Sequence, residues 1–88
     1  MLDSFSGAVA AEVRARRARL GLTQQELADM AGVSERFVRF VEQGKPSVQL
    51  DSLTAILETL GLELRLYTRT SRAAHALTGQ TGDQEAPR

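Results

Sequence analysis

The sequence predicts an all-α fold of four to five short helices, followed by a single β-strand near the C-terminus. Apolar residues recur every three or four positions along residues 8–61, which is typical of short amphipathic helices. Glycines break this region at intervals that suit helix ends: Gly21, Gly32, Gly44 and Gly61. From residue 62 to residue 68 the apolar period falls to two, as in a β-strand.

The first two predicted helices carry clear end signals. Residues 8–20 are rich in Ala and Arg, both strong helix formers. The second helix starts at Thr23, where the T-x-x-E spacing of Thr23 and Glu26 predicts a capping box. Its expected buried face consists of Leu27, Met30 and Ala31.

The third and fourth predicted helices are equally short. Ser34 is a favourable N-cap for a helix that ends near Gln43. Asp51 is the expected N-cap of the fourth helix. That helix has the most regular amphipathic stripe in the chain, at i, i+3, i+4 and i+7: Leu53, Ile56, Leu57 and Leu60.

Residues 21–44, GLTQQELADMAGVSERFVRFVEQG, join two of these helices through a tight turn at Gly32. Each helix begins with a residue that can cap it. Two short capped helices in this arrangement predict a helix-turn-helix, which places its second helix in the major groove of DNA.

The residues L-G-L-T-Q-Q-E-L-A-x-x-A-G-V-S, followed by F-V-x-x-V-E-Q-G-K, closely resemble the phage repressor/Cro-like (XRE) helix-turn-helix family over about residues 9–60. The strand that follows makes the chain most similar to HipB-type antitoxins, in which a repressor-like domain is followed by one strand that pairs across a homodimer. The resemblance implies a repressor of its own operon that also binds a HipA-type kinase toxin. A stand-alone XRE regulator of phage or metabolic genes, with no toxin partner, is the alternative.

The same resemblance implies which residues contact DNA. Gln24 is expected to approach the DNA backbone and brace the recognition helix, and Lys45 suits a phosphate. The recognition helix carries the base-reading positions: Ser34, Glu35, Arg36 and Arg39. Arg can pair bidentately with guanine and Glu can accept from cytosine.

Three side chains of the recognition helix can be interpreted either as contacts to DNA or as contacts within the protein. Glu35 is as well suited to an ion pair with Arg36 or Arg39 as to a cytosine contact. A phenyl ring can touch a thymine methyl group or pack inside the protein. Packing is favoured for Phe37, whereas neither is favoured for Phe40, which stays among the candidate DNA-binding residues.

Arg17 and Glu42 lie on otherwise apolar helix faces, and a buried charge needs a partner. The family resemblance implies an internal ion pair between them, with a structural role. The other arginines of residues 14–19 are interpreted as a solvated helix face, with a DNA-backbone contact by Arg14 as the alternative.

The strand predicts a homodimer, because a lone strand leaves its backbone polar groups unpaired. Its dimerisation residues are Leu62, Glu63, Leu64, Arg65 and Leu66. If two copies pair antiparallel about a two-fold axis at Leu64, Glu63 faces Arg65 of the other chain, twice. An axis at Arg65 would place two Arg side chains opposite each other, which is destabilising.

Composition bounds the class of protein. The 88 residues suffice for one small domain, with 42% apolar and 25% charged residues and a net charge of zero. Zero charge argues mildly against nucleic-acid binding unless basic residues gather on one face. We divide the chain into an N-terminal arm (1–7), the helix-turn-helix domain (8–61), the dimerisation strand (62–68) and a disordered tail (69–88), with a brief helical turn over 72–77 as an alternative.

Several classes of site are not expected. The chain has no Cys, no apolar run near the ~18 residues of a membrane span and no signal peptide, so a cytoplasmic protein at the bacterial nucleoid is expected. His75 stands alone, the acidic residues are scattered and no phosphate-cradling Gly loop is present. We therefore expect no catalytic residues, no metal and no cofactor, and an interaction with palindromic operator DNA rather than with a membrane.

Overall fold

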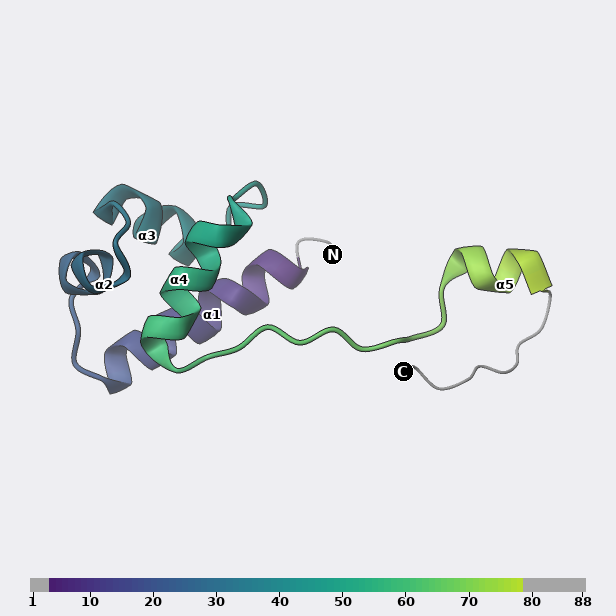
Figure 1. Cartoon of the computed structure of the whole chain (residues 1–88), viewed down its shortest axis with the longest axis horizontal. Helices are drawn as coiled ribbons and strands as arrows, with labels where there is room; N and C mark the ends of the chain where they lie inside the picture. Colours follow the sequence, from purple (N-terminus) through teal and green to yellow (C-terminus); the bar gives the residue numbers. More distant parts are fainter. Residues whose placement is uncertain (1–3, 79–88) are drawn as a thin grey trace.

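Helices account for most of residues 4–78, the part of the chain that the computed structural model describes. They are α1 (Ser4–Arg19), α2 (Gln24–Ala31), α3 (Glu35–Glu42), α4 (Leu50–Leu60) and α5 (Arg72–Thr78). Figure 1 shows α1 to α4 packed together, with residues 62–71 running away from them as an extended segment that leads to α5.

The ends of α2 and α3 are fixed by local hydrogen bonds. The predicted capping box is confirmed: Glu26 N donates to Thr23 Oγ1 at 3.0 Å, and Thr23 N donates to Glu26 Oε1 at 2.9 Å. Gly32 ends α2 in the left-handed conformation, with φ 74°, which glycine adopts without steric cost. The Oγ of Ser34 accepts a hydrogen bond from Phe37 N at 3.0 Å and so caps α3.

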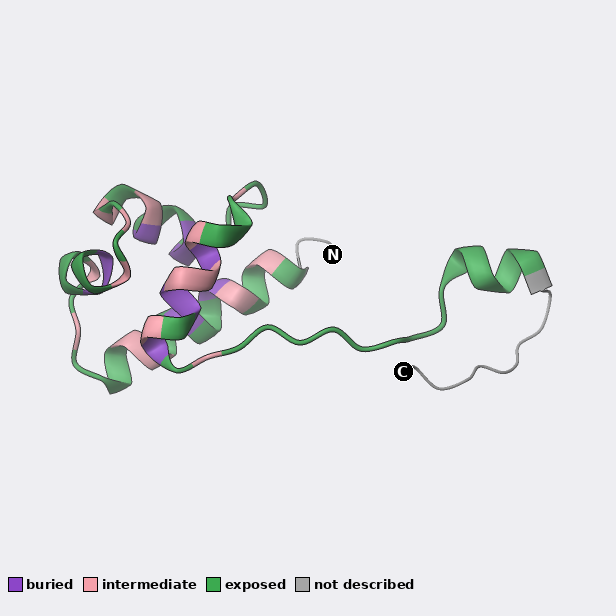
Figure 2. Cartoon of the chain, viewed as in Figure 1, coloured by how far each residue is buried: buried purple, intermediate pink, exposed green. Residues whose placement is uncertain are grey.

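One apolar core holds α1 to α4 together (Figure 2). The four residues of the predicted α4 stripe are all buried, which confirms that pattern. They meet buried side chains from the other three helices: Val13, Leu27, Ala28, Val38 and Val41. Burial of one such Val, Leu or Ile side chain contributes about 1.5–3 kcal/mol.

Three local predictions were wrong. Met30 is 63% exposed, because Ala28 joins Leu27 on the buried side and turns the buried face of α2 away from Met30. Helix α4 begins after Gln49, so Asp51 is not its N-cap but lies in its first turn. A carboxylate there interacts favourably with the helix dipole. Helix α1 starts at Ser4, within the predicted N-terminal arm.

The C-terminal region also differs from the prediction. Residues 62–68 form no β-strand in the single chain, because no other segment within residues 4–78 pairs with them. The predicted tail contains α5, at the position of the brief helical turn. Residues 1–3 of the predicted arm and residues 79–88 of the predicted tail lie outside the described residues.

Candidate nucleic-acid interface

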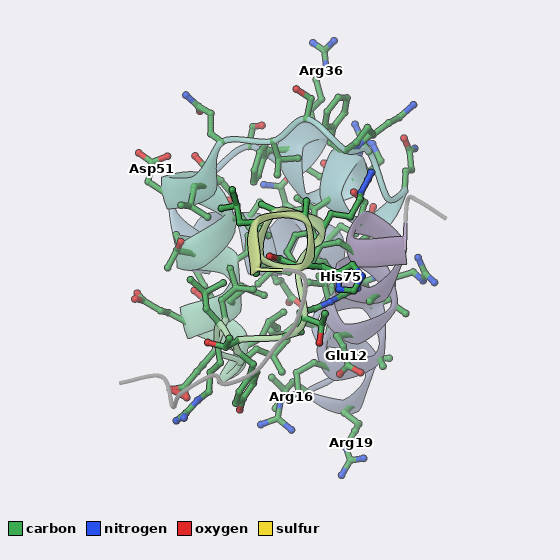
Figure 3. All side chains as sticks on the ribbon, turned by 90° about the vertical axis from the view of Figure 1, so that its right-hand side faces the viewer. Glu12, Arg16, Arg19, Arg36, Asp51 and His75 are labelled. Carbon is green, nitrogen blue, oxygen red and sulfur yellow. The ribbon has the colours of Figure 1, made fainter. Side chains whose placement is uncertain are left out.

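Helix α3 has one side in the core and one side in solvent. Val38 and Val41 are buried against the other helices, whereas Arg36, Arg39 and Phe40 are exposed. Figure 3 shows the Arg36 side chain extending away from the body of the protein. The packing of α3 therefore presents its basic side outward.

Glu35 pairs with Arg39 and not with Arg36. Glu35 Oε2 lies 3.1 Å from Arg39 Nη1, one helical turn away, and both side chains are partly exposed. Arg36 has no ion-pair partner within residues 4–78 and keeps its donors available. An exposed pair of this kind contributes only about 0.3–0.5 kcal/mol, so little energy opposes its opening.

The two aromatic side chains of α3 differ. Phe37 is half-buried and packs against the core, whereas Phe40 is 38% exposed. The Nζ atom of Lys45 lies 5.8 Å from the centroid of the Phe40 ring, within the range of a cation–π contact. Lys45 thus extends the outer surface of α3 beyond its C-terminus, next to Phe40.

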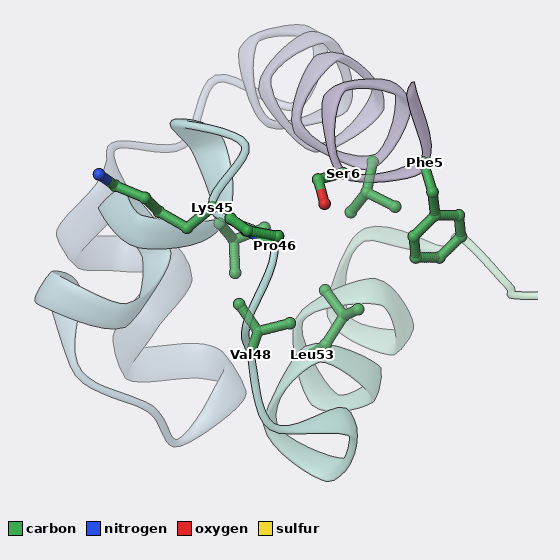
Figure 4. Close-up of a pocket in the computed structure, with 8 residues that line it drawn as sticks. Phe5, Ser6, Lys45, Pro46, Val48 and Leu53 are labelled. Atoms are coloured by element: carbon green, nitrogen blue, oxygen red, sulfur yellow. The ribbon is translucent and has the colours of Figure 1, made fainter. Parts of the chain in front are cut away.

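The loop after α3 directs Lys45 outward. A small cavity of about 30 Å³ lies between this loop, the start of α1 and α4, and is lined by Phe5, Pro46 and Leu53 among others. Figure 4 shows the amino group of Lys45 pointing away from that cavity. Lys45 therefore reaches solvent on the side of α3.

A polar junction holds α3 from behind. Arg17 of α1 donates twice to the Glu42 carboxylate, from Nε to Oε2 at 2.6 Å and from Nη2 to Oε1 at 2.9 Å. Gln24 of α2 adds a third bond, from Nε2 to Glu42 Oε1 at 3.0 Å. Arg14 Nη1 donates to the backbone oxygen of Glu42 at 2.6 Å. The junction (Arg14, Arg17, Gln24 and Glu42) thus ties three helices together at the end of α3.

Glu42 stays ionised although its side chain is only 4% exposed. Burial alone would raise the pKa of Glu42, but hydrogen bonds from Arg17 and Gln24 and the charges of Arg17 and Arg14 together lower it below its usual range. The hydrogen bond to Glu42 raises the pKa of Arg17 despite burial. Each charge therefore stabilises the other in its ionised form.

Two further arginine contacts were missed by sequence reasoning. Arg14 and Arg16 were interpreted as solvated, yet Arg14 bonds the end of α3, and Arg16 Nε donates to the backbone oxygen of Leu60 at the end of α4, at 2.8 Å. The last carbonyls of a helix lack partners within it and accept such donors. A cluster of Arg on one helix was the available signal, but its acceptors come from distant parts of the chain.

The exposed arginines are not gathered on one surface. Figure 3 places Arg19 at the opposite end of the molecule from Arg36. The exposed basic residues of α3 and of the loop after it are Arg36, Arg39 and Lys45, and Arg19 is remote from Arg36.

An outward-facing basic helix that follows a glycine turn and is braced by two other helices defines a helix-turn-helix DNA-binding domain. Residues 13–67 match the protein family described as helix-turn-helix, and the chain belongs to this family, in its XRE branch. It is thus a DNA-binding transcriptional regulator.

Two similar proteins agree with this assignment. The chain is 41% identical over 64 residues to the uncharacterized HTH-type transcriptional regulator y4mF of Sinorhizobium fredii (strain NBRC 101917 / NGR234), and the match covers 73% of this chain and 84% of that protein. It is similar in structure to the clp gene regulator ClgR of Corynebacterium glutamicum, with a TM-score of 0.58 and 32% identity. That match covers 65% of this chain and 61% of ClgR, which is less than two thirds of its length.

Residues 4–78 lack two other kinds of feature. No helix there has the length and apolar character to cross a bilayer. No group of three or more His, Cys, Asp or Glu side chains is placed to hold a metal ion in the same residues.

Proposed function

We propose that the chain is a dimeric, sequence-specific repressor whose two α3 helices enter successive major grooves of a palindromic operator. The observation that carries this proposal is the orientation of α3, with its apolar side in the core and Arg36 extended into solvent. Recognition helices of a two-fold dimer contact half-sites about one helical turn apart.

Within this proposal the residues of α3 divide the work. Arg36 contacts a base edge, and guanine is the base that matches its paired donors. Arg39 remains beside Glu35 or exchanges that ion pair for DNA, while Glu35 accepts from a cytosine. Ser34 and the N-terminus of α3 lie where a phosphate is favoured.

The remaining candidates contact the edges of the site. Gln24 braces α3 through Glu42 and approaches the DNA backbone at the start of α2. Lys45 binds a phosphate, and the exposed edge of Phe40 meets a thymine methyl group. Phosphate contacts position the protein, whereas base contacts give it sequence preference.

Dimerisation through residues 62–68 is supported by the two sides of this segment. Leu64 is 41% exposed and Leu66 is 98% exposed in the single chain. Arg65 Nη2 lies 3.2 Å from Glu63 Oε1, so the two charged residues share one side of the segment, as residues i and i+2 of a strand do. Antiparallel pairing about Leu64 would place Glu63 of each copy opposite Arg65 of the other.

We further propose that the chain is the antitoxin of a HipA-type kinase pair that autoregulates its operon. This proposal depends on the resemblance of the sequence to HipB-type proteins. The alternative is an XRE regulator without a toxin. An adjacent kinase reading frame and co-purification of its product would favour the antitoxin, whereas an isolated gene or a phage cassette would favour the alternative.

The experiment that tests operator binding is selection of duplexes from a random library, followed by affinity measurements on Arg36→Ala and Arg19→Ala. We expect a palindrome, and a loss of about 1–3 kcal/mol of discrimination at one position of each half-site for Arg36→Ala. Arg19→Ala is the matched control, because Arg19 is equally basic but remote from α3. An unchanged base preference in Arg36→Ala would remove Arg36 as a base-contacting residue.

A further inference from the structure

An apolar groove lies where the C-terminal segment leaves the helical domain. It has a volume of about 850 Å³. Apolar side chains of Phe5, Leu50 and Leu57 line it together with residues 62–66, and Thr54 and Glu58 of α4 add polar groups. Phe5 is 63% exposed and Leu50 is 66% exposed. Large apolar side chains gathered around one opening indicate a surface that another molecule covers.

The leucines of residues 62–66 become more exposed to solvent along the segment. Leu62 is half-buried and packs against the core of its own domain, whereas Leu66 is 98% exposed. Leu62, Leu64 and Leu66 share one side of an extended segment. Leu62 and Leu66 therefore lie on the same side of the segment, but the helical domain covers only Leu62 and leaves Leu66 exposed.

We propose that the groove of each subunit receives Leu66 from the segment of a second copy. This inference rests on the proposed dimer and adds its interaction surface. In an antiparallel pair centred on Leu64, Leu66 of one copy lies opposite Leu62 of the other. Directly opposite residues point to the same face of a sheet, so Leu66 of the second copy points toward the domain that covers Leu62.

The groove is much larger than one side chain, so it accommodates the neighbouring backbone of the second copy as well. Two-fold symmetry repeats the contact, and each dimer therefore has two filled grooves. On the other side of the paired segments, Glu63 and Arg65 exchange their ion pair within one chain for pairs between chains. Charge complementarity thus selects a second copy of this chain as the occupant.

Engineered cysteines test the pairing directly, since the chain contains no Cys of its own. Directly opposite residues of antiparallel strands have Cα atoms about 4.5–5.5 Å apart, within the reach of a disulfide. We expect Leu64→Cys to form a covalent dimer under mild oxidation. Tyr67→Cys is the control: in the Leu64-centred pair its two copies lie at opposite ends of the paired segments, roughly 20 Å apart, and should remain unlinked.

Alanine variants then test the groove itself through the dimer dissociation constant, measured by sedimentation. Leu66→Ala should weaken dimerisation about tenfold or more, because each dimer loses two buried leucines. Phe5→Ala should weaken it in the same direction. The double variant should weaken it by less than the product of the two single effects, since the same contact is lost in each. Tyr67→Ala, on the charged side of the segment, is the control and should change little.

The possible failures are distinguishable. A wild-type chain that stays monomeric at all concentrations would overturn the dimer and this inference with it. A dimer that Leu66→Ala leaves unchanged, or multiplicative effects of Phe5→Ala and Leu66→Ala, would overturn the groove contact alone. An apolar fluorescent dye, 8-anilinonaphthalene-1-sulfonate, that binds the Leu64→Cys dimer as well as the monomer would show an unfilled groove and also overturn it. Because Phe5 and Leu66 are exposed, circular dichroism should show that each monomer remains folded.

Discussion

The junction behind α3 and the segment of residues 62–68 both contain charged side chains next to apolar ones. They differ in whether these groups find partners within the same chain. At the junction, the Glu42 carboxylate has partners on α1 and α2 and is nearly inaccessible to solvent. Along the segment, Leu66 and the Glu63–Arg65 pair are exposed, and the backbone has no strand to pair with among residues 4–78. The first region is complete in one chain, whereas we propose that the second requires another copy.

This difference separates two requirements of the proposed DNA binding. The junction sets the orientation of α3 within a subunit. The segment would set the distance and angle between the α3 helices of two subunits. Changes at the junction should therefore alter folding stability, while changes in the segment should alter association at nearly constant stability of the monomer.

The largest effect is expected from Glu42→Gln. The substitution keeps the size of the side chain but leaves the Arg17 guanidinium without its counter-charge, and it turns an amide NH₂ toward the donors of Arg17 and Gln24. Breaking a buried ion pair in this way should cost about 3 kcal/mol of the free energy of unfolding, measured by urea denaturation. Glu12→Gln, on the exposed side of α1 (Figure 3), is the matched control and should remain within about 0.5 kcal/mol. Equal stability of the two variants would mean that the junction does not hold α3.

Acid should weaken the same region. The folded-state pKa of Glu42 is lowered, so its contribution to stability is complete above the ordinary pKa of glutamate, about 4.3, and is lost as the pH falls through the lower folded value. Urea denaturation at a series of pH values should show this loss in the wild type and a smaller loss in Glu42→Gln. Identical acid profiles would contradict the assignment.

A smaller effect is expected where the two regions meet. Arg16 Nε holds the backbone oxygen of Leu60, and Arg16 Nη2 would lie 3.2 Å from a Cβ atom placed at Gly61. Arg16→Met should retain most of the packing but lose this hydrogen bond, at a cost of about 1 kcal/mol of unfolding free energy. Arg19→Met is the control, because Arg19 is exposed at the end of α1. A thermal melt in which both variants match the wild type would show that the Arg16 contact is not stabilising.

Charge reversal in the segment should alter association and leave the folding stability of the monomer nearly unchanged. In the Leu64-centred dimer, Glu63→Arg or Arg65→Glu alone places like charges opposite each other twice, at about 0.2–1 kcal/mol for each pair. Each single variant should therefore weaken dimerisation about 2- to 30-fold in sedimentation, and the double reversal should restore it. Single variants that dimerise like the wild type would exclude the Leu64 axis.

The sequence predicted the features that depend on neighbouring residues. The capping box of Thr23 and Glu26, the Ser34 cap and the stripe of α4 need only local spacing. The contacts of Arg14 and Arg16 were not predictable in this way, because their acceptors lie at the ends of α3 and α4, about 28 and 44 residues further along the chain. The alternation of residues 62–68 likewise predicts an extended segment with one apolar and one charged side. It does not identify the strand with which this segment pairs.

The candidate site shows the same limit. The order of residues identified α3 and its outward positions, and the structure adds that Glu35 pairs with Arg39 and leaves Arg36 available. The base that each side chain contacts depends on the DNA, so the roles of Ser34, Arg36 and Lys45 stay predictions.

Sedimentation of the protein with a fluorescent duplex that carries the selected palindrome tests the central proposal most directly. We predict two chains on each duplex, with binding at least ~100-fold weaker to a duplex that keeps only one half-site, because a second bound subunit acts at high effective concentration. A single chain that binds one half-site as tightly as the palindrome would contradict the proposal, as would a protein that binds no duplex from the library.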